Sequence, residues 1–181
     1  LSRAKFIRYP HKDINALESL LQKHSSLNTH RSTLIVTDGV FSMDGDIAPM
    51  KELFELADKY NCIFMVDDAH ATGVLGKKGR GTLEHFGIEN PNIIQMGTLG
   101  KALGCFGAYV AGSKKLVDYL INKARSFIYT TSLPPSICAA GIAALDIIES
   151  EPQLRVDLRN RVVYFRTELK QAGLDTLNSE T

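Results

Sequence analysis

The sequence lacks any arrangement of cysteines that would form a metal site or a disulfide framework. Its three cysteines, at positions 62, 105 and 138, lie far apart in a chain of 181 residues, and no two share a metal-ligand or redox spacing. An odd and scattered set of this kind favours reduced thiols. We therefore expect a cytoplasmic protein.

A long hydrophobic segment is also missing. The most apolar stretch, residues 134–148, contains Asp146 and is shorter than the ~20 residues that a membrane-spanning helix needs. We expect it to form a buried helix. No apolar run follows the charges at the N-terminus, which argues against a signal peptide. Because the chain begins with Leu1 and has no initiator methionine, we expect it to lie inside a longer protein.

A strong excess of charge of one sign is absent as well. Lysine and arginine number 21 against 20 aspartates and glutamates, a formal net charge of +1, so no overall field attracts nucleic acid or an anionic membrane. Two short basic groups, residues 77–80 and 114–115, are flanked by glycine or serine and indicate solvated turns. Neither nucleic acid nor a membrane is an expected partner.

What the chain does contain is a regular alternation of strand and helix patterns over a length typical of about one domain. Short β-branched or apolar runs predict strands at residues 33–37, 63–66, 92–96 and 108–111. Apolar spacing and capping residues predict helices at residues 13–23, 49–60, 113–123, 134–150 and 152–172. The pattern predicts an α/β domain with a mainly parallel sheet, flanked by helices that cover its strands on both faces.

Polar residues follow three of these strands, in residues 38–46, 67–70 and 98–101. Ligands of open α/β sheets bind outside the carboxyl ends of the strands, so we expect the three segments to meet at one edge. Residues 97–104 (Gly-Thr-Leu-Gly-Lys-Ala-Leu-Gly) lack the glycine spacing and the hydroxyl residue of a P-loop. Lys101 is then either a surface lysine in a turn or a partly buried nucleophile toward a carbonyl.

Three interpretations are open for Asp67, Asp68 and His70. They could bind a metal, although no further ligand stands at a suitable spacing. One aspartate could cap a local turn. One could instead face the pyridinium nitrogen of pyridoxal phosphate (PLP) and keep that nitrogen protonated.

Two further segments carry hydroxyl groups. The Asp-Gly-Asp group of residues 44–46 resembles part of a calcium loop but lacks its closing glutamate, so we expect a tight turn in which Ser42 offers a hydroxyl to the same edge. Residues 129–135 (Tyr-Thr-Thr-Ser-Leu-Pro-Pro) precede a helix that opens with proline. They form either an ordinary cap or a phosphate site at a helix N-terminus.

Together, Asp-Asp-Ala-His at 67–70, the glycine-rich loop at 97–104 and residues 129–135 resemble the α-oxoamine synthases. These are PLP-dependent transferases of fold-type I that condense an amino acid with an acyl thioester, carried by CoA or by an acyl carrier protein, and release CO₂. The likeness extends over nearly the whole chain. It implies an incomplete PLP-binding large domain at residues 1–172, the start of a small domain at 173–181, and a homodimer with a shared active site.

The resemblance also implies roles for individual residues. Lys101 would form the Schiff base and later act as the base, Asp67 would pair with the pyridinium nitrogen, and His70 and Ser42 would bond near the phenolic oxygen of the ring. The remaining cofactor ligands would bind phosphate: Thr98 in its own subunit, and Thr130 and Thr131 across the dimer.

In the family, the residue that stacks on the cofactor would precede Leu1, and the arginine that binds the substrate carboxylate would follow Thr181. We therefore expect the isolated chain to be inactive. Two alternatives of other classes stay open: a folded fragment without catalysis, and a metal hydrolase built on Asp67, Asp68 and His70. The resemblance itself implies no metal.

Overall fold

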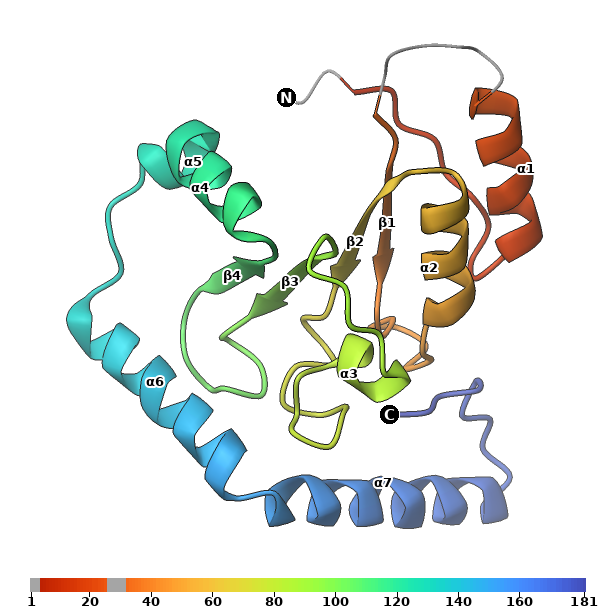
Figure 1. The fold of residues 1–181 in the computed structure, drawn as a ribbon. Coiled ribbons are helices and arrows are strands. Elements are labelled where there is room, and N and C mark those ends of the chain that lie inside the picture. Colours follow the sequence, from red (N-terminus) through yellow and green to blue (C-terminus); the bar gives the residue numbers. More distant parts are fainter. Residues whose placement is uncertain (1–3, 26–31) are drawn as a thin grey trace.

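The computed structural model describes residues 4–25 and 32–181. Its centre is one four-stranded sheet, with the strands side by side in chain order (Figure 1). The first three strands are parallel, and the fourth is antiparallel to the third. The bounds are β1 (Leu34–Asp38), β2 (Ile63–Asp67), β3 (Ile94–Thr98) and β4 (Ala108–Ala111). The predicted α/β class with a mainly parallel sheet is confirmed.

Seven helices are described: α1 (Ile14–Ser25), α2 (Met50–Lys59), α3 (Thr82–Phe86), α4 (Lys114–Lys123), α5 (Arg125–Ile128), α6 (Pro135–Ser150) and α7 (Gln153–Gln171). Capping residues set two of the starts as predicted. The Asp13 carboxylate accepts the Ala16 N–H at 2.8 Å, and the Ser113 hydroxyl accepts the Leu116 N–H at 3.3 Å. Helices α3 and α5 were not predicted, because 5 and 4 residues are too few to show a helical period.

Strand β3 begins two residues later than predicted. We expected a strand at residues 92–96, but β3 begins at Ile94. The Asn90 side-chain oxygen accepts the Asn92 N–H at 2.9 Å, and the Asn90 carbonyl accepts the Ile93 N–H at 3.2 Å. These bonds hold residues 90–93 in a turn.

The main core lies between one face of the sheet and helices α1 and α2, which lie together on that side (Figure 1). From the sheet it takes the alternate residues Ile35, Phe64 and Val66, and from α2 it takes Met50 and Leu53. Each of these five side chains is at most 4% exposed. Alternation along each strand sends the side chains between them to the opposite face.

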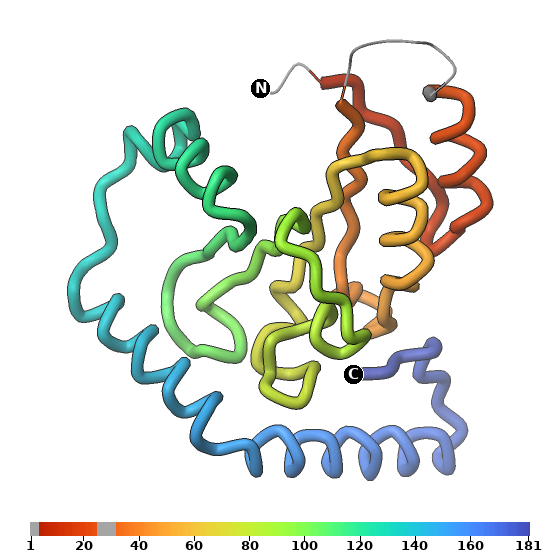
Figure 2. The backbone as a smooth tube through the Cα atoms, viewed as in Figure 1, coloured from red at the N-terminus to blue at the C-terminus, as the bar shows by residue number. Residues whose placement is uncertain are grey.

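The opposite face is open in the described chain, so the expectation of strands covered on both faces was wrong. Leu34, Val36 and Ile63 are 44–50% exposed on it. The later helices leave the sheet after β4, and α6 and α7 follow the outside of the molecule (Figures 1 and 2). For the same reason α6 is not the buried helix that we expected: Ile142 is 62% exposed, and Gly141 is its one buried residue. No helix of the described residues is both long and apolar enough to cross a membrane.

A buried carboxylate, that of Asp68, ties the loop after β2 to the sheet. Its side chain has no exposure and accepts three hydrogen bonds: from the Thr82 N–H at 2.9 Å, the Thr82 hydroxyl at 2.5 Å and the Gln95 amide at 2.7 Å. Burial raises the pKa of Asp68, and the bonds from Thr82 and Gln95 oppose that rise. The space around the carboxylate is full, since a Cβ on Gly39 or Gly81 would overlap it.

Replacement of this carboxylate tests its structural role. Asp68→Ala leaves the Thr82 N–H, the Thr82 hydroxyl and the Gln95 amide without their acceptor, and we expect it to lower the free energy of unfolding by about 3 kcal/mol or more. The measurement is urea unfolding followed by circular dichroism. The control is Asp146→Ala at an exposed aspartate of α6, which should change the value by less than about 0.5 kcal/mol. Equal stabilities of the two variants would contradict the role.

Candidate functional site

Three polar side chains form a row at the carboxyl edge of the parallel strands. Asp38, the last residue of β1, is the register partner of Asp67, the last residue of β2. Asp67 is in turn the partner of Met96 in β3, and Thr98 lies two residues further along that strand. Because side chains alternate, Asp38, Asp67 and Thr98 share the open face of the sheet.

Lys101 and His70 lie near this row. Burial raises the pKa of Asp38, the negative charge of Asp67 raises it further, and the charges of His70 and Lys101 oppose the shift. The loops after β2 and β3 touch, since a Cβ on Gly73 would lie 2.7 Å from the Ala102 side chain. The structure therefore brings together the three segments that the sequence placed at one edge.

The row offers unused hydrogen-bonding capacity. The hydroxyl oxygen of Thr98 is buried and has no partner among the described residues. Asp67 accepts the Ala69 N–H at 3.0 Å through one carboxylate oxygen, and no hydrogen bond among the described residues occupies the other. Buried polar atoms without partners in a folded protein call for a ligand or water. A free hydroxyl can bind a phosphate, a free carboxylate oxygen can bind a basic ring nitrogen, and a nearby amine can attack a carbonyl carbon. The row therefore fits a ligand that carries all three groups.

The geometry separates the roles of the two neighbouring aspartates. Both oxygens of the Asp68 carboxylate are used inside the protein, as a cap on the N-terminus of α3 and as the acceptor of Gln95. Asp67 ends its strand on the open face instead. The metal interpretation needs Asp67, Asp68 and His70 as joint ligands, and the engagement of Asp68 removes one of them.

Three other predicted site residues are not joined to the row. Ser42 is exposed in the turn between Val40 and Ile47. Thr130 and Thr131 are exposed in the segment before α6, and in the described chain no hydrogen bond links them to Thr98 or Lys101. That segment does reach the loop after Lys101, because the Leu133 side chain lies 3.2 Å from where a Cβ on Gly107 would be.

A cluster around Asp46 escaped the sequence analysis. One oxygen of this buried carboxylate lies 2.9 Å from His11 Nε2 and 3.0 Å from Lys12 Nζ, and the His11 ring packs edge-on against Phe41 at 4.2 Å between centroids. Burial alone would raise the pKa of Asp46, but the bonds from His11 and Lys12 outweigh it and lower the pKa. The cluster holds the turn that carries Ser42. Partners 34 and 35 positions apart leave no local pattern in a sequence.

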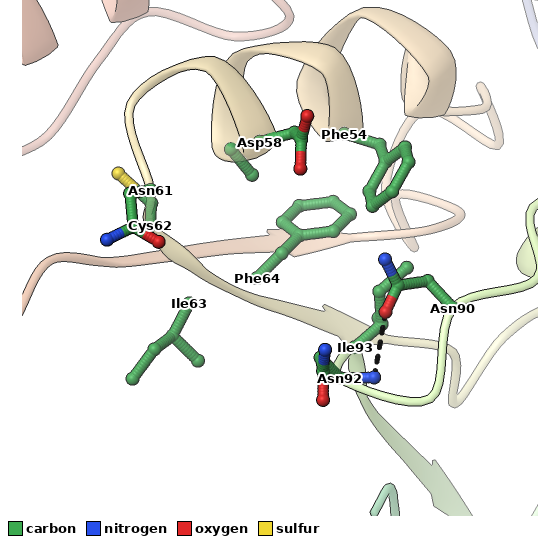
Figure 3. A pocket seen from close by; sticks show the side chains of 10 residues that line it. Phe54, Asp58, Asn61, Cys62, Ile63, Phe64, Asn90, Asn92 and Ile93 are labelled. Atoms are coloured by element: carbon green, nitrogen blue, oxygen red, sulfur yellow. Dashed lines mark hydrogen bonds between the residues drawn. The ribbon is translucent and has the colours of Figure 1, made fainter.

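A pocket lies at the amino ends of β2 and β3, opposite the carboxyl edge (Figure 3). It is lined by Cys62, which precedes β2, by Ile63 at the start of that strand, and by the asparagine turn before β3. Burial raises the pKa of the Cys62 thiol, so this cysteine is a poor nucleophile. Since ligands of parallel sheets bind at the carboxyl edge, the row of Asp38, Asp67 and Thr98 is the candidate site.

Comparison with known proteins identifies the family of the chain. A family model described as aminotransferase class I and II matches residues 1–181, and the chain belongs to that family. The chain is similar to 8-amino-7-oxononanoate synthase of Geobacter sulfurreducens, with 56% identity over 183 residues. That alignment covers 100% of the chain and 46% of the relative.

Two solved structures resemble the whole fold. Serine palmitoyltransferase from S. paucimobilis with a bound PLP–myriocin aldimine matches with a TM-score of 0.88 and 31% identity, over 94% of this chain and 43% of the other. The 8-amino-7-oxononanoate synthase from Francisella tularensis matches with a TM-score of 0.78 and 34% identity, over 99% of this chain and 50% of the other. These likenesses confirm the predicted fold-type I class. The chain spans about half the length of the relatives that it matches.

Proposed function

We propose that this chain is the larger part of the PLP-binding domain of an 8-amino-7-oxononanoate synthase. In this proposal the protein condenses L-alanine with pimeloyl-CoA, releases CO₂ and acts in biotin biosynthesis. The observation that carries the proposal is the row of Asp38, Asp67 and Thr98 with Lys101 and His70 nearby. The names of the relatives support the proposed product, 8-amino-7-oxononanoate, and the three free thiols support a cytoplasmic location.

Each residue of the site has a physical role in this proposal. Bound PLP supplies an electron sink for the carbanion formed at the amino acid. Lys101 would provide the amine that holds the cofactor covalently and that later moves the proton at the substrate Cα. Asp67 would keep the pyridinium nitrogen protonated through its free oxygen, and Thr98 would donate its unpartnered hydroxyl to the phosphate. His70 would bond to the phenolic oxygen, as would Ser42 from the exposed turn after β1.

The proposed domains are residues 1–172 for cofactor binding and 173–181 for the start of a small domain. Residues 1–3 and 26–31 of the first lie outside the described residues. The second segment is anchored on the first, because the Glu180 N–H and the Thr181 N–H both donate to the Gly45 carbonyl.

Two alternatives differ in what they demand. A glycine C-acetyltransferase uses glycine and acetyl-CoA, and tends to have Ser-Asn-Ser-Leu where residues 130–133 read Thr-Thr-Ser-Leu. A product assay of the full-length protein with alanine or glycine against acetyl- and pimeloyl-CoA separates these two enzymes. Bound PLP gives an absorbance that treatment with borohydride abolishes. A folded fragment without catalysis would show no such absorbance.

The covalent attachment is tested at Lys101. In the full-length protein, Lys101→Ala should abolish the borohydride-fixed bond between PLP and a lysine while circular dichroism stays unchanged, because it removes the only side-chain amine of residues 97–104. Peptide mapping by mass spectrometry is the measurement, with Lys115→Ala as the control. A fixed cofactor on another lysine in the Lys101→Ala protein would refute the assignment.

Asp67 is tested by a change that keeps its shape. Asp67→Asn removes the charge that retains the pyridinium proton, so we expect kcat to fall by orders of magnitude with little change in the free energy of unfolding. Asp68→Ala should show the opposite pattern, a large loss of stability, because it leaves the Thr82 N–H, the Thr82 hydroxyl and the Gln95 amide without an acceptor. Steady-state kinetics and urea unfolding measure the two effects. Near-normal kcat for Asp67→Asn would assign the role to another residue.

We propose a homodimer in which Thr130 and Thr131 bind the phosphate held by the partner subunit. The exposed position of both hydroxyls before the N-terminus of α6 supports this. A mixture of Lys101→Ala subunits with Thr130→Ala/Thr131→Ala subunits should regain activity, because one of the two sites in each mixed dimer is intact. Activity of the mixture and of each parent is the measurement. No recovery after proven subunit exchange would show that each site is built from one chain.

A further inference from the structure

A second polar site lies where the loop after β2 meets the junction of α6 and α7. A pocket there is lined by Lys77, Lys78 and Arg80 from the loop and by Glu149, Pro152 and Arg155 from the two helices. Four cations thus share a pocket with one carboxylate. The sequence places Arg155 far from the loop, so residues 77–80 alone indicated only a solvated turn.

Contacts fix this loop against the helices. The Arg155 guanidinium donates to the Ile148 carbonyl at 2.6 Å and to the Lys77 carbonyl at 3.0 Å. Gly79, with a φ of +74°, packs so closely that an added Cβ would lie 3.1 Å from Ile148 and 3.3 Å from Arg155. The pocket is therefore held in place without a ligand, which reduces the entropy cost of binding.

The positive charge of the pocket is not neutralised within the described chain. The Arg155 guanidinium donates to two backbone carbonyls. Among the described residues, no ion pair involves Lys77, Lys78 or Arg80. The Glu84 carboxylate accepts the backbone N–H groups of Lys78 and Arg80 and thereby shapes the loop. Helix α6 ends at this pocket and helix α7 begins there, so their dipoles oppose each other and the side-chain charges set the local field.

We propose that this pocket binds the phosphate groups of the CoA that carries the acyl donor, an inference that rests on the proposed acyl-CoA chemistry. CoA holds its phosphates at the far end of a long arm from the thioester, so they must dock away from the reacting carbon. Contacts of the loop after β2 link the pocket to the candidate site. A Cβ on Gly73 would touch Ala102, next to Lys101, and would also lie 3.4 Å from Ile148, whose carbonyl binds Arg155.

Isothermal titration of the full-length, PLP-loaded protein with CoA tests the proposal. Lys77→Gln/Lys78→Gln removes two charges from the pocket and no residue of the catalytic row, and should weaken CoA binding at least about tenfold. Binding of dephospho-CoA should suffer less from the same change. The KM for acyl-CoA should rise while kcat stays unchanged, because the reacting groups are untouched.

The matched control is Lys114→Gln/Lys115→Gln, which removes an equal charge from an adjacent lysine pair at the start of α4, outside the pocket. It should bind CoA as the wild type does. Wild-type affinity in Lys77→Gln/Lys78→Gln, or an equal loss in the control, would overturn the phosphate site alone. A wild-type protein that carries PLP but does not bind CoA would contradict the proposed acyl-CoA chemistry and this inference with it.

Discussion

The carboxylate of Asp68 has no solvent contact, and its bonds to Thr82 and Gln95 join the loop after β2 to α3 and β3. The positions of several residues at the carboxyl edge of the sheet depend on this attachment. The loop that returns at Thr82 contains the basic residues 77–80, and its first residues carry His70. A buried carboxylate is costly unless its bonds are complete, so the loop has a strong energetic reason to adopt one path. The same path aligns the preceding residue, Asp67, with the open face.

The row at this edge combines charges that oppose and support one another. Asp38 and Asp67 are register partners and repel each other, which together with burial raises the pKa of Asp38. The charges of Lys101 and His70 act in the other direction. Such a balance responds to ligands: a cation placed beside Asp67 would offset the repulsion that Asp38 now experiences. Neighbouring carboxylates are therefore consistent with a site that binds a protonated ring nitrogen.

Local sequence signals predicted the elements well and their environment less well. Asp13 and Ser113 marked two helix starts because capping depends on residues three positions away. The choice between Asp67 and Asp68 stayed open because the two are adjacent, and only the strand alternation and the distant partners Thr82 and Gln95 distinguish them. The bond between His11 and Asp46 left no signal for a similar reason. The prediction that α6 is buried was wrong. The apolar composition of a helix shows that burial of its surface would be favourable, but it does not show which other element would bury it.

The open face of the sheet and the candidate site are parts of one surface. Leu34 and Val36 share this face of β1 with Asp38, so whatever covers the apolar residues also borders the charged row. Removal of water there would strengthen every interaction in the row, because charges act more strongly on one another at low dielectric. It would also add to the burial that already raises the pKa of Asp38. Relatives about twice as long as this chain have further residues for such a cover. The electrostatic interactions of Asp67 and Lys101 therefore depend on how the apolar side chains of Leu34 and Val36 are covered, although those side chains carry no charge themselves.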